Sequence, residues 1–121
     1  MTQRQFFSLR RLGCALCTSL KGLRRVWREE TAFRQEVVIA VFLAPLTFFL
    51  EVSAGEHALL LAMLFLVLFT ELLNSALEAI VDLASPEKHS LAAKAKDAAS
   101  AAVMVSIVAA FVVWAAVLWP F

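Results

Sequence analysis

The chain has little glycine and little cysteine, and both shortages restrict its chemistry. It contains 3 glycines, Gly13, Gly22 and Gly55, so no glycine-rich loop and no G-x-x-x-x-G-K-[ST] motif is present. The 2 cysteines, Cys14 and Cys17, form one C-x-x-C without a second ligand pair, which argues against a zinc site and favours two reduced thiols. Any nucleotide site in this chain must therefore be built without a phosphate-binding loop.

Charged residues are also scarce over three long stretches. Hydrophobic residues make up 62% of the 121 residues, whereas soluble proteins average about 45–50%. We therefore predict an all-α integral membrane protein, folded as one membrane domain over 1–121. Its predicted elements are a surface helix at about 5–29 and membrane helices at 30–50, 58–83 and 90–121. Pro45 lies inside the first membrane helix, where neighbouring helices can satisfy the freed carbonyl.

Basic residues are absent from one of the three extramembrane regions. Eight of the 11 Lys and Arg residues lie at 4–34 and the other three lie at 88–96, whereas residues 51–57 contain none. The positive-inside rule then places the N-terminus and the second loop in the cytoplasm and the C-terminus outside. No secretory signal with a cleavage site is expected, because the apolar stretches are internal.

The predicted surface helix is amphipathic. Apolar residues recur at steps of three and four, at Leu9, Leu12, Leu16, Leu20, Leu23 and Trp27. Basic residues occupy the opposite side, at Arg10, Lys21, Arg24, Arg25 and Arg28. This pattern is typical of a helix that lies on a membrane surface. Its basic face suits anionic lipid head groups or a polyphosphate, and simple lipid anchoring is the better supported of the two.

Polar residues form a stripe within the second predicted membrane helix. Glu71, Asn74, Ser75, Glu78 and Asp82 fall within an arc of roughly 100°. Each charged acid near a bilayer centre costs roughly 2.5–3.5 kcal/mol, so the stripe must face protein, water or a cation. Counted from residue 58, Glu71 lies about 20 Å into a core about 30 Å thick. Glu78 and Asp82 follow near the cytoplasmic interface.

Further charges lie at the same depth. The third membrane helix opens with Lys94, Lys96 and Asp97, and the first opens with Glu30, Arg34 and Glu36. Carboxylate oxygens suit magnesium, and lysines beside a helix N-terminus suit phosphate. Asp82 and Lys94 are equally well read as ordinary interfacial charges bathed in water.

Three thin helices cannot surround such a stripe, so we expect a homo-oligomer. Small residues form a ridge on the third membrane helix that favours close helix packing, at Ala95, Ala99, Ala102, Ser106 and Ala110. We also expect Glu30 and Glu78 of one site to come from different chains.

The residues alone leave two classes of protein open. One is a lipid-modifying enzyme that uses a metal and phosphate, and the other is a small channel or carrier lined by carboxylates.

The segment from Glu71 to Asp82 narrows the choice, because it resembles the prokaryotic diacylglycerol kinase signature E-x-x-N-[ST]-A-x-E-x-x-x-D. Three further stretches agree in order and spacing, at 21–23, 30–36 and 95–103. The resemblance implies a bacterial inner-membrane homotrimer with active sites shared between subunits. It implies transfer of the γ-phosphoryl group of MgATP to the hydroxyl of diacylglycerol, which gives phosphatidic acid.

The resemblance also implies residue roles. Glu71 corresponds to the base and Asn74 to a positioning group, while Glu30 and Glu78 correspond to the Mg²⁺ carboxylates. The implied ATP contacts are Arg11, Glu30, Glu78, Glu87, Lys88, His89, Lys96 and Asp97. The implied lipid contacts are Trp27, Phe33, Arg34, Gln35, Glu71, Ser100 and Trp114. The rival within the family is undecaprenol kinase, although residues 33–36 resemble the diacylglycerol type. Membrane lipids are expected partners, and nucleic acid is not.

Overall fold

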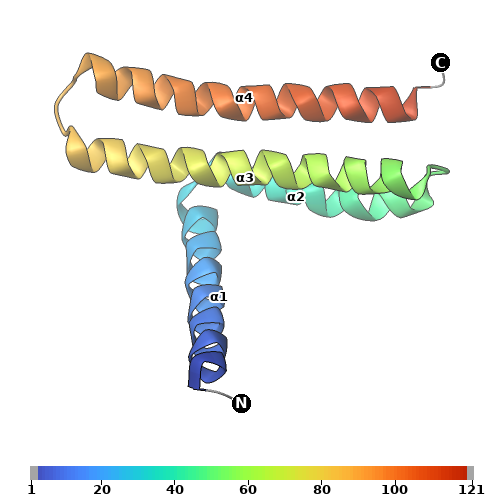
Figure 1. Ribbon diagram of the computed structural model, residues 1–121. Helices are drawn as coiled ribbons and strands as arrows, with labels where there is room; N and C mark the ends of the chain where they lie inside the picture. Colours follow the sequence, from blue (N-terminus) through green and yellow to red (C-terminus); the bar gives the residue numbers. More distant parts are fainter. Residues whose placement is uncertain (1–2, 120–121) are drawn as a thin grey trace.

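The computed structural model describes residues 3–119, and the side chains of residues 8–119. It contains four α-helices, α1 (Gln3–Glu29), α2 (Thr31–Leu46), α3 (Ala54–Ala84) and α4 (Ser90–Leu118), and one 3-10 turn, η1 (Thr47–Phe49) (Figure 1). The described part of the chain has no β-strand. The prediction of an all-helical fold is therefore confirmed.

Three of these helices are long and apolar enough to cross a membrane. They are Thr31–Phe49, which joins α2 to η1, then Ala54–Ala84 and Ser90–Leu118. Pro45 lies in the last turn of α2, where its ring costs little helix continuity because η1 follows directly. The chain is a multi-pass membrane protein with three candidate spans.

Caps fix where the two longer membrane helices begin. α3 starts at Ala54 rather than at about residue 58, because Ser53 and Glu56 form a capping box. The Glu56 amide donates to Ser53 Oγ at 3.2 Å, and the Ser53 amide donates to Glu56 Oε1 at 3.3 Å. His89 caps α4, since its Nδ1 accepts a hydrogen bond from the Leu91 amide at 3.1 Å.

α3 is the central membrane helix. α4 runs antiparallel along one side of it, α2 packs along another, and the Cα atoms of α2 and α4 stay more than 8 Å apart (Figure 1). Ala99 and Ser106 of the predicted small-residue ridge are buried, while Ala102 of the same ridge is exposed. The Ser106 hydroxyl also forms a hydrogen bond with Thr70 Oγ1 at 2.8 Å. Small side chains thus let α3 and α4 approach closely.

α1 stands away from the other three helices at a steep angle (Figure 1). Its apolar stripe, which includes Leu12 at 67% exposure, is exposed in the part of the chain whose side chains are described. The chain changes direction at Glu30, whose extended backbone (φ −111°, ψ 110°) separates α1 from α2. An uncovered apolar stripe on such a helix fits the predicted position on a membrane surface.

The membrane helices also leave much apolar surface uncovered. Phe33, Leu60 and Ala99 are buried, but Phe42 and Phe111 are 74% and 73% exposed. A soluble monomer rarely exposes so much apolar surface. Lipid tails and further copies of the chain are the environments that suit it, and the homo-oligomer remains a prediction.

Candidate active site

Glu71 is the buried centre of the polar stripe. Its side chain is 6% exposed, so it faces protein within the chain rather than lipid. The Glu30 and Glu78 carboxylates lie within electrostatic reach of it. Three carboxylates therefore form an acidic cluster, with Glu71 and Glu78 on α3 and Glu30 at the α1–α2 junction.

Glu30 reaches this cluster from the junction of α1 and α2. Ser75 Oγ donates a hydrogen bond to Glu30 Oε1 at 3.4 Å, and Glu78 lies one turn further along the same face of α3. Glu30 and Glu78 are therefore brought to one site within a single chain. This contact favours a site with both carboxylates from one chain over the expected site built from two chains, because the extended backbone at Glu30 turns its side chain onto α3 of its own chain.

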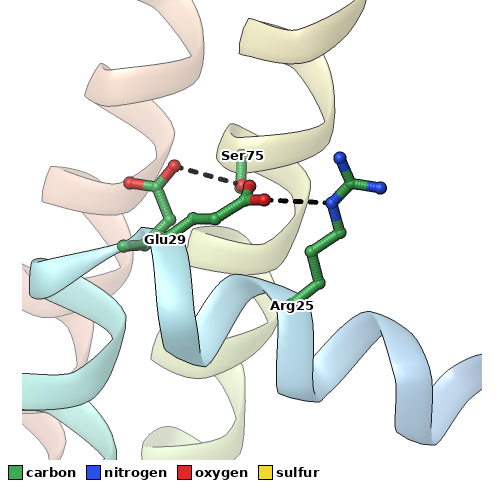
Figure 2. A network of polar contacts seen from close by, with 4 residues as sticks. Arg25, Glu29 and Ser75 are labelled. Carbon is green, nitrogen blue, oxygen red and sulfur yellow. Dashed lines mark hydrogen bonds and ion pairs between the residues drawn. The ribbon is translucent and has the colours of Figure 1, made fainter.

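Polar contacts fix the junction itself. Figure 2 shows the ion pair within α1, in which Arg25 Nε lies 3.1 Å from Glu29 Oε1, and Ser75 of α3. Arg34 Nη1 donates to the carbonyl oxygens of Trp27 and Arg28, each at 2.9 Å. A guanidinium at the C-terminal end of α1 also complements the helix dipole. Arg34, predicted as a lipid contact, thus holds the turn that positions Glu30.

Asn74 links the cluster to Glu78. Its Nδ2 donates to Glu78 Oε1 at 3.4 Å, while its buried Oδ1 has no hydrogen-bond partner among residues 8–119. Buried acceptors without a partner are rare in folded proteins and are often completed by a ligand or water. The amide therefore suits the predicted positioning role, because it is ready to accept a hydrogen bond from a bound hydroxyl.

Glu36 is a further carboxylate near Glu71, and the sequence alone indicated no role for it. Its half-buried side chain lies on α2 within electrostatic reach of Glu71, and its buried Oε2 has no hydrogen-bond partner among the described side chains. The available signal was a lone carboxylate at the start of an apolar run. The position of Glu36 beside Glu71 depends on the packing of α2 against α3, which no local sequence pattern specifies.

Glu36 also marks one end of an apolar groove. The groove lies over α3 between α2 and α4 and has a volume of about 260 Å³. Its walls include Leu43 of α2, Leu64 and Leu68 of α3, and Phe111 and Trp114 of α4. Trp114 is fixed there because its Nε1 donates to the Leu60 carbonyl at 3.2 Å. The groove exists because α2 and α4 pack on α3 while their backbones stay apart.

A second, polar pocket lies at the end of α3 and the start of α4. It has a volume of about 520 Å³, and its walls include Asp82, Glu87, Lys88, His89, Ser90 and Lys96. Four predicted ATP contacts, Glu87, Lys88, His89 and Lys96, therefore gather at one place. The N-terminus of α4 opens beside the pocket, which favours bound anions.

Several predicted contacts lie apart from these sites. Arg11 is exposed on α1, 19 residues before Glu30 and so about 28 Å away along the helix. Asp97 and Ser100 are exposed on α4, and Gln35 is exposed on α2. Phe33 is buried at the start of α2, and Trp27 is 40% exposed near the end of α1. Within one chain, these residues line neither the groove nor the polar pocket.

The donor chemistry of the cluster fits a magnesium ion. Carboxylate oxygens of Glu30 and Glu78 are hard ligands, and magnesium typically takes one or two carboxylates together with phosphate oxygens and water. Among residues 3–119, no three His, Cys, Asp or Glu side chains converge on one metal position. A cage made only of protein ligands, as structural zinc requires, is therefore absent from the described chain.

These features define a small multi-pass membrane protein in which one long helix, α3, carries the buried Glu71 between residues that line an apolar groove and residues that line a polar pocket. Residues 17–118 match the family model for prokaryotic diacylglycerol kinase. The diacylglycerol kinase of Pseudomonas aeruginosa PAO1 is 47% identical over 110 residues, which cover 91% of this chain and 89% of that protein. The diacylglycerol kinase of Escherichia coli K12 is 44% identical over 101 residues, covering 84% and 83%. That of Helicobacter pylori 26695 is 42% identical over 105 residues, covering 87% and 82%. The chain belongs to the prokaryotic diacylglycerol kinase family.

Proposed function

We propose that this protein transfers the γ-phosphoryl group of MgATP to the free hydroxyl of diacylglycerol at the cytoplasmic face of a bacterial inner membrane. Membership of the family makes it an ATP-dependent lipid kinase. The observation that carries the detailed proposal is the buried Glu71. Along α3, Glu71 lies one turn beyond Leu68 of the apolar groove and about 15 Å before Val81 of the polar pocket. The groove suits acyl chains and the pocket suits a nucleotide.

In the proposed reaction, acyl chains lie in the groove and the lipid hydroxyl points toward Glu71. The Glu71 carboxylate accepts the hydroxyl proton as the lipid oxygen attacks the γ-phosphorus, and the bond to the β-phosphate oxygen breaks to release ADP. The partner-free Oδ1 of Asn74 orients the hydroxyl. Such a base contributes roughly 10²–10⁴-fold to the rate, so positioning and charge neutralisation supply the rest.

The nucleotide occupies the polar pocket in this proposal. Lys96 contacts its phosphates, and Glu87, Lys88 and His89 contact the remainder of ATP. Glu30 and Glu78 would hold Mg²⁺, which neutralises charge on the transferring phosphoryl group. Asp82 of the pocket lies one turn beyond Glu78 on α3, so the pocket neighbours the carboxylate cluster at the end of α3 that we propose to be cytoplasmic, where a lipid head group and a soluble nucleotide can meet.

We propose that three copies of the chain form a homotrimer whose active sites are shared between subunits. Arg11 lies too far along α1 to reach the pocket of its own chain, so as an ATP contact it must serve a neighbouring chain. The uncovered apolar faces of α2 and α4 supply surface for such an assembly. A composite site completed by α1 of a second chain accounts for both observations.

Substrate choice is tested by presenting two lipid alcohols to the purified protein in phospholipid vesicles with γ-labelled ATP. We expect label in phosphatidic acid when diacylglycerol is present, and little or none in undecaprenyl phosphate when undecaprenol replaces it. A groove of about 260 Å³ beside Glu36 suits acyl chains whose glycerol end carries the hydroxyl. Preferential labelling of undecaprenol would assign the chain to the other activity in the family.

The proposed topology places the α2–α3 loop outside and α1 in the cytoplasm. We expect a thiol introduced by Glu51→Cys, with Cys14 and Cys17 changed to serine, to react with an impermeant maleimide in intact spheroplasts, because Glu51 is exposed in that loop. The native Cys14 and Cys17 are free and exposed on α1, so the unmodified chain is the matched control. It should be labelled only after lysis. The opposite labelling pattern would reverse the topology.

A further inference from the structure

Asp82 forms an ion pair with Lys96 across the cytoplasmic ends of α3 and α4. The two side chains are 65% and 42% exposed. Exposed ion pairs contribute little to folding stability. The two helices are held together by the buried Ala99 and Ser106 instead. The ion pair therefore contributes little to the packing of α3 against α4, and we looked for its role in the adjacent polar pocket.

Lys96 faces two carboxylates that lie one helical turn apart. Asp82 is its ion-pair partner, and Glu78 is also within electrostatic reach. A lysine side chain has a flexible stem and three equivalent donors, so a single ammonium group can move between such neighbours. In this structure the Lys96 ammonium contacts Asp82, and its other donors are left for further partners.

We propose that Asp82 is a positioning residue that acts through Lys96 on the bound nucleotide. Its carboxylate holds the ammonium group at the wall of the polar pocket, which both residues line, and keeps it away from the metal carboxylate Glu78. The remaining donors of Lys96 then contact the ATP phosphates. This inference rests on the proposed function, since it assumes that the polar pocket binds ATP.

Two physical effects give Asp82 this role. A lysine that is already ordered loses less side-chain freedom when it binds phosphate, so the nucleotide binds more tightly. Without the Asp82 charge, Glu78 becomes the nearest anion to Lys96, and their pairing competes with both phosphate and metal. Both effects act on nucleotide binding more than on the chemical step.

The first test compares steady-state kinetics of Asp82→Asn with the wild-type protein. We expect the KM for ATP to rise on the order of tenfold, as for other residues that orient a ligand-binding group, while kcat changes by less than about threefold. Asp82→Glu should restore most of the affinity, because it returns the charge. Glu51→Gln removes one carboxylate in the α2–α3 loop, at the opposite end of the membrane helices, and should leave KM unchanged. Thermal unfolding of Asp82→Asn should match wild type.

The second test measures ATP binding by calorimetry without lipid substrate, so that turnover is not the readout. Asp82→Asn should weaken binding in the wild-type background but have no further effect in a Lys96→Met background. An equal loss in both backgrounds would show that Asp82 acts structurally and would overturn the inference. An unchanged or improved affinity in Asp82→Asn would also overturn it. A wild-type protein that binds no ATP would instead overturn the proposed function together with this inference.

Discussion

Glu71→Gln is expected to lower the kcat for phosphatidic acid formation by roughly 10²–10⁴-fold, the usual contribution of a general base. Glutamine keeps the size of the side chain and its hydrogen-bonding capacity but cannot accept the hydroxyl proton at neutral pH. Because Glu71 is buried at 6% exposure, the neutral amide also avoids the cost of a buried charge, so the fold should be retained. The measurement is label transfer from ATP to diacylglycerol at saturating concentrations of both.

Two controls make this result interpretable. ATP binding to Glu71→Gln should stay close to wild type, because Glu71 contacts the lipid hydroxyl rather than the nucleotide in the proposed reaction. Glu51→Gln loses the same charge at an exposed position outside the site and should keep full activity. If Glu71→Gln retains wild-type kcat, Glu71 is not the base.

Mixing of variant subunits should show whether two residues of one active site come from the same chain or from different chains. Glu30→Ala and Glu78→Ala are each expected to be nearly inactive, because each removes a carboxylate where charge is neutralised. Since Ser75 holds Glu30 beside Glu78 within one chain, trimers refolded from a mixture of these two variants should remain inactive. Every site in such a trimer lacks one of the two carboxylates.

A mixture of Arg11→Ala with Glu78→Ala should behave differently. Arg11 is expected to serve a neighbouring chain, so some mixed trimers contain a complete site built from Arg11 of one chain and Glu78 of the other. At ATP concentrations below the KM, activity should exceed the weighted mean of the two separate variants. Recovery from the Glu30→Ala and Glu78→Ala mixture, with trimers verified by cross-linking, would place those two carboxylates in different chains after all.

The main elements of this fold follow from simple sequence signals. Long apolar stretches predicted three membrane helices, and the amphipathic period predicted a separate α1. The early start of α3 was also available in the sequence, because Ser53 and Glu56 have the spacing of a capping box. Local hydrogen-bonding rules are sufficient for features of this kind.

The arrangement of the site required tertiary structure. The sequence showed that Glu71 must face away from lipid, but the pairing of Ser75 with Glu30 depends on the backbone angle at a single residue between two helices. The apolar groove exists because α2 and α4 both pack on α3 while their backbones stay apart. The place of Glu36 beside this groove likewise depends on helix packing that no local pattern specifies.

The most direct test of the central claim is to follow phosphatidic acid formation and cation flux in the same vesicles containing the purified protein. With diacylglycerol, Mg²⁺ and γ-labelled ATP, the account predicts labelled phosphatidic acid and ADP in equal amounts, and no cation flux above that of protein-free vesicles. Cation flux through the wild-type protein without any labelled lipid would contradict the account and favour a carboxylate-lined channel.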